Sequence, residues 1–135
     1  TFGADLIAGF PTETDEMFKD TLDLVDKCNL THLHVFPYSP RDNTPAARMP
    51  QVDKSIVKKR ANILRSKGIE KFTKLMQDRV GEKDLVLIEK NQNEKSIGKD
   101  QNFFNVILNE KLKEGNLVPC VYIGVKNNML LARRL

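Results

Sequence analysis

The first forty residues have the apolar pattern of a strand, a helix and a second strand. Residues 3–10 are almost continuously apolar and end at Pro11. Such a run predicts a parallel strand buried on both faces, in which Asp5 must find a partner inside the fold. Residues 31–36 predict the second strand, which ends at Pro37 because proline has no backbone N–H to donate.

The segment between these strands predicts a capped amphipathic helix. Residues 12–15, Thr-Glu-Thr-Asp, have the form of a capping box. The positions that follow at helical spacing should face the core, and they are Met17, Phe18, Thr21, Leu22, Val25 and Cys28. Strand, helix and strand together predict a βαβ unit, in which ligands bind at the carboxyl ends of the strands. Those ends are residues 9–11 and 36–39.

The remaining pattern predicts a helix and then an all-β region. Residues 53–77 are helical in period, with Gly68 marking a break or kink. After residue 80 the period becomes two, in runs at 85–89, 103–108, 118–125 and 129–132 separated by Asn- and Gly-rich turns. These runs predict a small antiparallel barrel of four or five strands. One βαβ unit cannot close a barrel, so the first half is an incomplete domain. The fold class is α/β followed by all-β.

Charge is unevenly distributed between the halves. The net charge is +4, from 22 Lys and Arg against 18 Asp and Glu. Residues 1–66 are neutral, and residues 67–135 carry the whole excess. A basic half suggests a polyanion, and nucleic acid is the commonest one. The alternative is that the lysines only solubilise a small β domain.

Cysteine and histidine contents argue against a metal site within the chain. Cys28 and Cys120 fit no metal-ligand spacing, and there are only two histidines, His32 and His34. The cysteines are typical of free, reduced thiols in a cytoplasmic protein. No apolar run approaches the roughly 18 residues that a membrane span needs, so we expect no membrane partner.

Two segments carry a resemblance to a known family. Residues 5–14, DLIAGFPTET, resemble a strand and turn of radical S-adenosylmethionine (SAM) enzymes. Residues 36–46, FPYSPRDNTPA, resemble a segment of tRNA methylthiotransferases, and residues 34–41 with 46–50 are most similar to the branch acting on threonylcarbamoyl-adenosine. The basic β half is similar to the TRAM domain of these enzymes.

The sequence departs from that family in three ways. Thr12 and Asn43 stand where the family has glycine, and the cysteines that hold its [4Fe–4S] clusters are absent. The resemblance therefore implies the C-terminal third of such an enzyme, whose N-terminal part would bind the clusters. It divides the chain into a barrel portion at 1–66, a helical connector at 67–78 and a TRAM-like, OB-like barrel at 79–135.

The resemblance implies two sets of site residues and no catalytic residue in this chain. We expect SAM to lie against Asp5, Ile7, Gly9, Phe10, Phe36, Tyr38 and Ser39. Gly9 has an alternative role as a packing glycine, Asp5 has one in satisfying nearby backbone groups, and Glu13 is expected to act on the helix N-terminus. We expect tRNA to contact Arg41, Lys90, Lys95, Lys99, Phe103, Phe104, Arg133 and Arg134. Phe103 and Phe104 should lie on opposite faces of a strand, so that one is core and the other is free to stack on a base.

The function that the resemblance implies is C2-methylthiolation of a hypermodified adenosine beside the tRNA anticodon. The chain by itself should be inactive because it lacks the cluster cysteines. A second hypothesis is a stand-alone RNA-binding module or an inactive gene remnant. A third, methylthiolation of a ribosomal protein, is disfavoured by residues 34–50.

Overall fold

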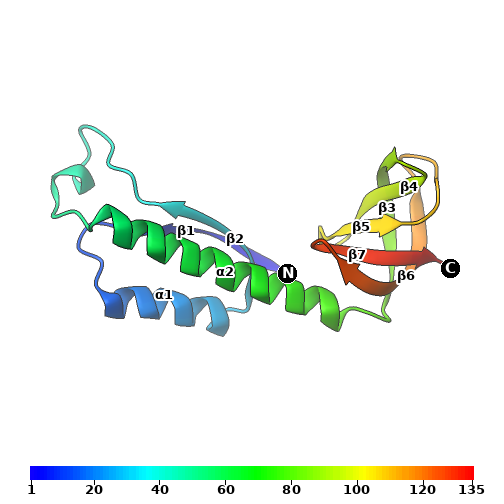
Figure 1. Cartoon of the computed structure of the whole chain (residues 1–135), viewed down its shortest axis with the longest axis horizontal. Coiled ribbons are helices and arrows are strands. Elements are labelled where there is room, and N and C mark those ends of the chain that lie inside the picture. Colours follow the sequence, from blue (N-terminus) through cyan, green and yellow to red (C-terminus); the bar gives the residue numbers. More distant parts are fainter. The chain divides into compact units, whose positions relative to one another are not determined.

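The computed structural model describes residues 1–135 and divides into two compact units, residues 1–72 and residues 73–135. The elements of both are labelled in Figure 1. The division falls within the helix α2, Lys54–Asp78, so the helical segment at 67–78 is part of one continuous helix.

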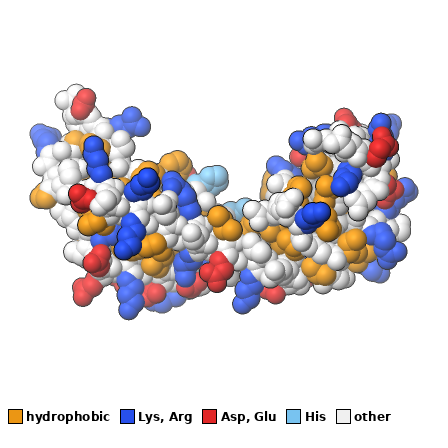
Figure 2. Space-filling view, in the orientation of Figure 1, with side chains coloured by type: hydrophobic (Ala, Val, Ile, Leu, Met, Phe, Trp, Pro, Cys, Tyr) orange, Lys and Arg blue, Asp and Glu red, His pale blue; other side chains and the backbone are white.

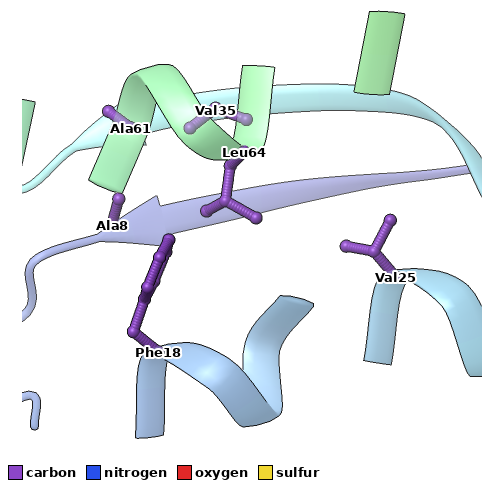
Figure 3. Packing of buried hydrophobic residues seen from close by; sticks show 6 residues of the cluster. All are labelled: Ala8, Phe18, Val25, Val35, Ala61 and Leu64. Atoms are coloured by element: carbon purple, nitrogen blue, oxygen red, sulfur yellow. The ribbon is translucent and has the colours of Figure 1, made fainter. Parts of the chain in front are cut away.

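The first unit is a two-stranded parallel sheet with both long helices packed on one face. Strand β1 (Phe2–Ala8) pairs with β2 (Leu30–Pro37), and α1 (Asp15–Lys27) connects them. A short 3₁₀ helix, Ala46–Arg48, precedes α2. The core lies between the sheet and the helices (Figure 3), and its members are Ala8, Phe18, Val25, Val35, Ala61 and Leu64.

The other face of this sheet is uncovered. Ile7 is 54% exposed and Phe36 is 52% exposed. Asp5, two residues before Ile7 on β1, is exposed as well. The predicted burial on both faces, and the predicted internal partner for Asp5, are therefore wrong for this chain. The physical reason is that α1 and α2 both cover the same side, which leaves alternate residues of each strand in solvent.

The helix α1 begins two residues later than the predicted capping box. Thr14 is the N-cap, and its side chain accepts a hydrogen bond from the Met17 amide at 3.2 Å. Phe18 and Val25 are buried as predicted, whereas Met17 is exposed. Cys28 is also exposed, because it lies at the C-cap, after the last helical turn.

The helix α2 runs without a break through Gly68, so the predicted kink is wrong. A Cβ at Gly68 would lie 3.1 Å from a side-chain carbon of Leu33. The glycine instead allows the helix to approach β2 closely. No helix in the structure combines the length and the apolar character that crossing a membrane requires.

The second unit is a closed five-stranded barrel, which confirms the predicted barrel. Its strand order is β3-β4-β5-β7-β6. The strands are β3 (Lys83–Gln92), β4 (Lys95–Asp100), β5 (Asn105–Leu108), β6 (Leu117–Lys126) and β7 (Met129–Arg134). All neighbouring strands are antiparallel except β5 and β7, which are parallel. The apolar runs predicted four of the strands but not β4, whose sequence KSIGKD holds a single large apolar residue.

A buried ionic cluster lies inside the barrel around Arg79. The Arg79 guanidinium pairs with Asp100, with Asp84 at 2.6 Å and with Glu82 at 3.0 Å. The Tyr122 hydroxyl donates to Asp100 at 2.8 Å, and the Phe104 and Tyr122 rings lie within 5.4 and 4.9 Å of the guanidinium carbon. Burial, followed by the hydrogen bond to Asp100, raises the pKa of Tyr122 above its ordinary value. Tyr122 therefore stays a neutral hydrogen-bond donor within the cluster.

Candidate functional site

The carboxyl ends of β1 and β2 meet as the βαβ pattern predicted. The Tyr38 amide donates to the Ala8 carbonyl at 2.8 Å. The rings of Phe10 and Tyr38 then meet edge to face, with centroids 5.4 Å apart and planes at 71°. This contact links the two segments that follow the strands, so that they form one rim.

The uncovered sheet face leads up to this rim. Ile7 and Phe36 are register partners on β1 and β2, and Asp5 pairs with His34 two residues earlier. Paired residues of a sheet share a face, so Asp5, Ile7 and Phe36 form one surface with a carboxylate beside two apolar side chains. We call these three residues the open face.

Gly9 has a packing role at the rim. Its φ of +73° is in the left-handed region, and a Cβ there would lie 2.5 Å from a methyl carbon of Val57 on α2. Both observations account for the glycine without any ligand, because a side chain would be strained in conformation and would collide with the helix.

Glu13 holds the turn after β1 in place. Its carboxylate accepts from the Gly9 amide at 3.1 Å and from Arg60 at 2.7 Å, and Arg60 also binds Asp15 at 2.7 Å. Burial alone would lower the pKa of Arg60, but the hydrogen bonds to Asp15 and Glu13 raise it overall. Glu13 thus connects the turn after β1 to α2. The sequence predicted only an effect of Glu13 on the N-terminus of α1, because the contact with Arg60 joins segments that are distant along the chain.

Tyr38 and Ser39 lie apart from the open face. Both line a pocket of about 380 Å³ between the segment after β2 and the first half of α2. The seven residues predicted to face SAM are therefore distributed over the open face, the turn at Gly9 and Phe10, and this pocket. The structure brings Asp5, Ile7 and Phe36 together, and it connects Phe10 to Tyr38.

Five cationic side chains on the outside of the barrel form a basic strip across β3, β4, β6 and β7. None of the outward residues on β4, β5 and β7 is acidic, and Lys90 on β3, beside the exposed Glu89, pairs with the outward Ile97. The strip consists of Lys90, Lys95, Lys99, Lys126 and Arg133. A groove of about 260 Å³ lies within it, and its lining includes the apolar Ile107, Met129 and Leu131 together with Lys95 and Lys126. Sequence reasoning missed Lys126, because its relation to Lys95 depends on the strand order.

The other residues predicted to contact RNA have different environments. Phe103 is 75% exposed in the turn before β5, whereas Phe104 is fully buried against Arg79. One core and one exposed phenylalanine are thus confirmed, but neither lies on a strand, because β5 begins only at Asn105. Phe104 is excluded as a stacking surface. In the strand register Arg134 lies opposite the buried Cys120 on β6. Arg134 is therefore on the other face of β7 from Arg133.

Arg41 lies in solvent in the loop after β2, where its carbonyl accepts from the Thr44 hydroxyl at 2.7 Å. Figure 2 shows lysine and arginine side chains on the surface of both units, so cationic surface is not confined to the barrel. What distinguishes the basic strip is that the outward positions of β4, β5 and β7, which it crosses or borders, hold no carboxylate.

The residues present do not fit an iron–sulfur cluster. Cys28 is exposed in the first unit and Cys120 is buried in the second. No group of three or more His, Cys, Asp or Glu side chains converges in a way that would hold a metal ion. Cluster ligation needs three or four converging thiolates, and this chain has none to offer beyond these two.

Comparison with known proteins identifies relatives along nearly the whole chain, although no family model matches it. The threonylcarbamoyladenosine tRNA methylthiotransferase of Rickettsia prowazekii is 44% identical over 130 residues, which is 96% of this chain. The chain is homologous to the tRNA methylthiotransferases. The tRNA-2-methylthio-N(6)-dimethylallyladenosine synthase of Bartonella tribocorum is 32% identical over 93% of the chain. The threonylcarbamoyladenosine enzyme of Thermotoga maritima is 40% identical over 63% of it. The chain spans 30%, 28% and 20% of the lengths of these three relatives, in that order.

Proposed function

We propose that the chain is the C-terminal part of a cytoplasmic radical SAM tRNA methylthiotransferase, with a SAM-facing sheet and a tRNA-holding barrel. The observation that carries this proposal is the open face. An exposed pair of large apolar side chains on a parallel sheet is costly in water, and it is the surface that further strands and a ligand would cover in a complete barrel.

The open face and rim fit an adenosyl group chemically. Phe10 and Phe36 are half-exposed aromatic side chains suited to contact with a planar base, and Asp5 offers a carboxylate to hydroxyl or ammonium donors. SAM, when bound, supplies the adenosyl radical precursor and the methyl group. The clusters require cysteines from outside this chain, so the chain's own role is to position SAM and the substrate RNA.

The barrel is proposed to hold the anticodon region of the tRNA. The basic strip can neutralise several phosphates, and Phe103 offers a ring on which an unpaired base could stack. The apolar groove between Lys95 and Lys126 adds a surface for a sugar or a base edge.

A chimaera tests the proposal. The matching 130 residues of the Rickettsia prowazekii relative are replaced by this chain, and the tRNA nucleosides are analysed by mass spectrometry in a host lacking its own enzyme. We expect 2-methylthio-threonylcarbamoyladenosine. Ile7→Ser with Phe36→Ser should reduce it by at least about tenfold, because adenosyl contacts of this size contribute over 1.4 kcal/mol.

The matched control is Leu24→Ser, since Leu24 is similarly exposed, at 49%, but lies on α1. It should leave the modification unchanged. A folded chimaera that binds tRNA but leaves it unmodified would favour the second hypothesis, a stand-alone RNA-binding module without chemistry.

A further inference from the structure

The pocket beside α2 has features that the proposed function does not use. It is separate from the open face and is lined by Tyr38, Ser39 and Gln51 on one side and by Lys54, Lys58 and Arg65 of α2 on the other. At about 380 Å³ it lies within the size range of pockets that bind small ligands.

Its electrostatics favour an anion. Three cationic side chains line it, no carboxylate does, and none of the three takes part in an ion pair. Arg65 is held by neutral acceptors, because it donates to the Val35 carbonyl at 3.0 Å and to the Asn62 side chain at 3.3 Å. Its charge is therefore oriented but not neutralised.

The acidic residue immediately before α2, Asp53, already has hydrogen-bond partners. The Asp53 carboxylate accepts from the Ser55 amide at 2.8 Å and from the Ser55 hydroxyl, so it caps the helix N-terminus. These hydrogen bonds lower the pKa of Asp53. Since Asp53 does not line the pocket, the lysines and Arg65 have no internal counter-ion there.

Tyr38 supplies an independent indication of a ligand. Its hydroxyl oxygen is buried and has no hydrogen-bond partner, although its backbone and ring are fixed by Ala8 and Phe10. Buried hydroxyls are normally paired, because leaving one unpaired is unfavourable. An oxygen-rich ligand in the pocket would provide the missing partner.

The residues that line the pocket favour a ligand with both an apolar part and an anionic part. Val57 and Ala61 are buried behind the pocket, and prolines flank Tyr38 and Ser39, so an apolar body can lie beside the cations. We propose that this pocket binds the phosphate group of a nucleotide, with the ribose or base against the apolar wall and the phosphate oxygens at Lys54, Lys58, Arg65 and the Tyr38 hydroxyl. The nucleotide is either a free one or part of an RNA backbone.

The test is calorimetric titration of the full chain with adenosine 5′-monophosphate, inorganic phosphate and adenosine. We expect the monophosphate to bind and adenosine to bind at least about tenfold more weakly, because the charge-assisted contacts are lost. Lys54→Gln with Lys58→Gln should weaken monophosphate binding by at least about tenfold. Tyr38→Phe, which removes only the hydroxyl, should weaken it severalfold.

Lys59→Gln is the matched control, because Lys59 lies on the same helix but does not line the pocket. Its affinity for the monophosphate should equal that of the unmodified chain. Absence of binding by the monophosphate and by phosphate, or an equal loss in Lys59→Gln, would overturn the proposal.

The source of the phosphate is decided by titrating tRNA into the same variants. A parallel loss of tRNA affinity identifies an RNA phosphate, and an unchanged tRNA affinity identifies a free nucleotide. The outcome is independent of the chimaera, because it requires neither SAM nor methylthiolation.

Discussion

The sheet of one unit closes into a barrel, whereas the sheet of the other unit has two strands and one uncovered face. In residues 73–135 five strands close on themselves around a buried apolar core, and a charged cluster is buried with its partners. In residues 1–72 two strands carry helices on one face only, and Ile7 and Phe36 remain exposed on the other. Closure therefore separates a sheet that encloses its own core from a sheet that leaves two large apolar side chains of one face in solvent.

The buried ionic cluster around Arg79 should give the largest loss of stability when it is disrupted. Arg79→Ala should destabilise the barrel by about 3–5 kcal/mol, because it leaves the buried carboxylates of Asp84 and Asp100 without a cation. Urea unfolding followed by barrel amide NMR signals measures the change. Lys113→Ala, at an exposed lysine, is the control, and a loss below about 1 kcal/mol for Arg79→Ala would mean that the cluster is solvated.

Substitutions on the two sides of the β1–β2 sheet should differ nearly as strongly in their effect on the free energy of unfolding. Leu64→Ala removes a fully buried side chain (Figure 3) and should cost about 2–4 kcal/mol. Ile7→Ala, on the open face, should cost less than about 0.5 kcal/mol. Both are measured by urea unfolding of the first unit. A similar cost for the two substitutions would show that something already covers the open face, such as a second copy of the chain.

Alkaline pH should weaken the barrel through its buried neutral groups. Burial raises the pKa of Cys120 to about 11, above the roughly 8.5 of an unfolded thiol. Only the unfolded state ionises between these values, so the stabilisation is complete below about pH 8.5 and is lost as pH rises towards 11. The loss should be at most about 3.5 kcal/mol, from about 1.4 kcal/mol per pH unit over about 2.5 pH units.

Urea unfolding at pH 8 and pH 10.5 measures this loss. Cys120→Ala should reduce the difference between the two pH values, whereas Cys28→Ala, at the exposed thiol, should leave it unchanged. Equal behaviour of the two variants would contradict a buried neutral thiol at Cys120.

The smallest effect concerns a strained turn in the open unit. Thr12 has a φ of +69°, which is unfavourable for a β-branched residue. Thr12→Gly should stabilise the first unit by a net of about 0.5–1 kcal/mol. This value is what remains of the relieved strain once the greater conformational entropy of glycine in the unfolded chain is subtracted. Asn43→Gly is the control, because asparagine already tolerates its φ of +65°. Destabilisation by Thr12→Gly in thermal unfolding would contradict the strained conformation.

The local patterns were predictable where short-range physics decides them. The period-two runs predicted the barrel, and the βαβ pattern predicted the meeting of residues 9–11 with 36–39. Burial of the first strand on both faces was wrong, since an apolar run does not reveal how many layers cover a sheet. The strand β4 was missed because its alternation uses serine, glycine and aspartate inside the barrel.

The candidate sites were predictable only in part, for a similar reason. Asp5, Ile7 and Phe36 share a face through strand register, which alternation predicts. The roles of Glu13 and Gly9 depend on Arg60 and Val57, which lie about fifty residues away along the chain. Lys126 and the pocket beside α2 likewise arise from contacts between distant segments.

The central claim is that the closed barrel holds tRNA through its basic strip, and salt dependence tests it most directly. Anisotropy of labelled tRNA with the full chain, from low to physiological salt, should give a log–log slope of about −2 to −4 for three to five phosphate contacts. Lys95→Gln with Lys126→Gln should make the slope shallower by about 1.5, because each lost phosphate contact removes roughly 0.7–0.9. Lys111→Gln with Lys113→Gln, at exposed lysines outside the strip, should leave it unchanged. No binding at low salt, or equal changes in the two double variants, would contradict the claim.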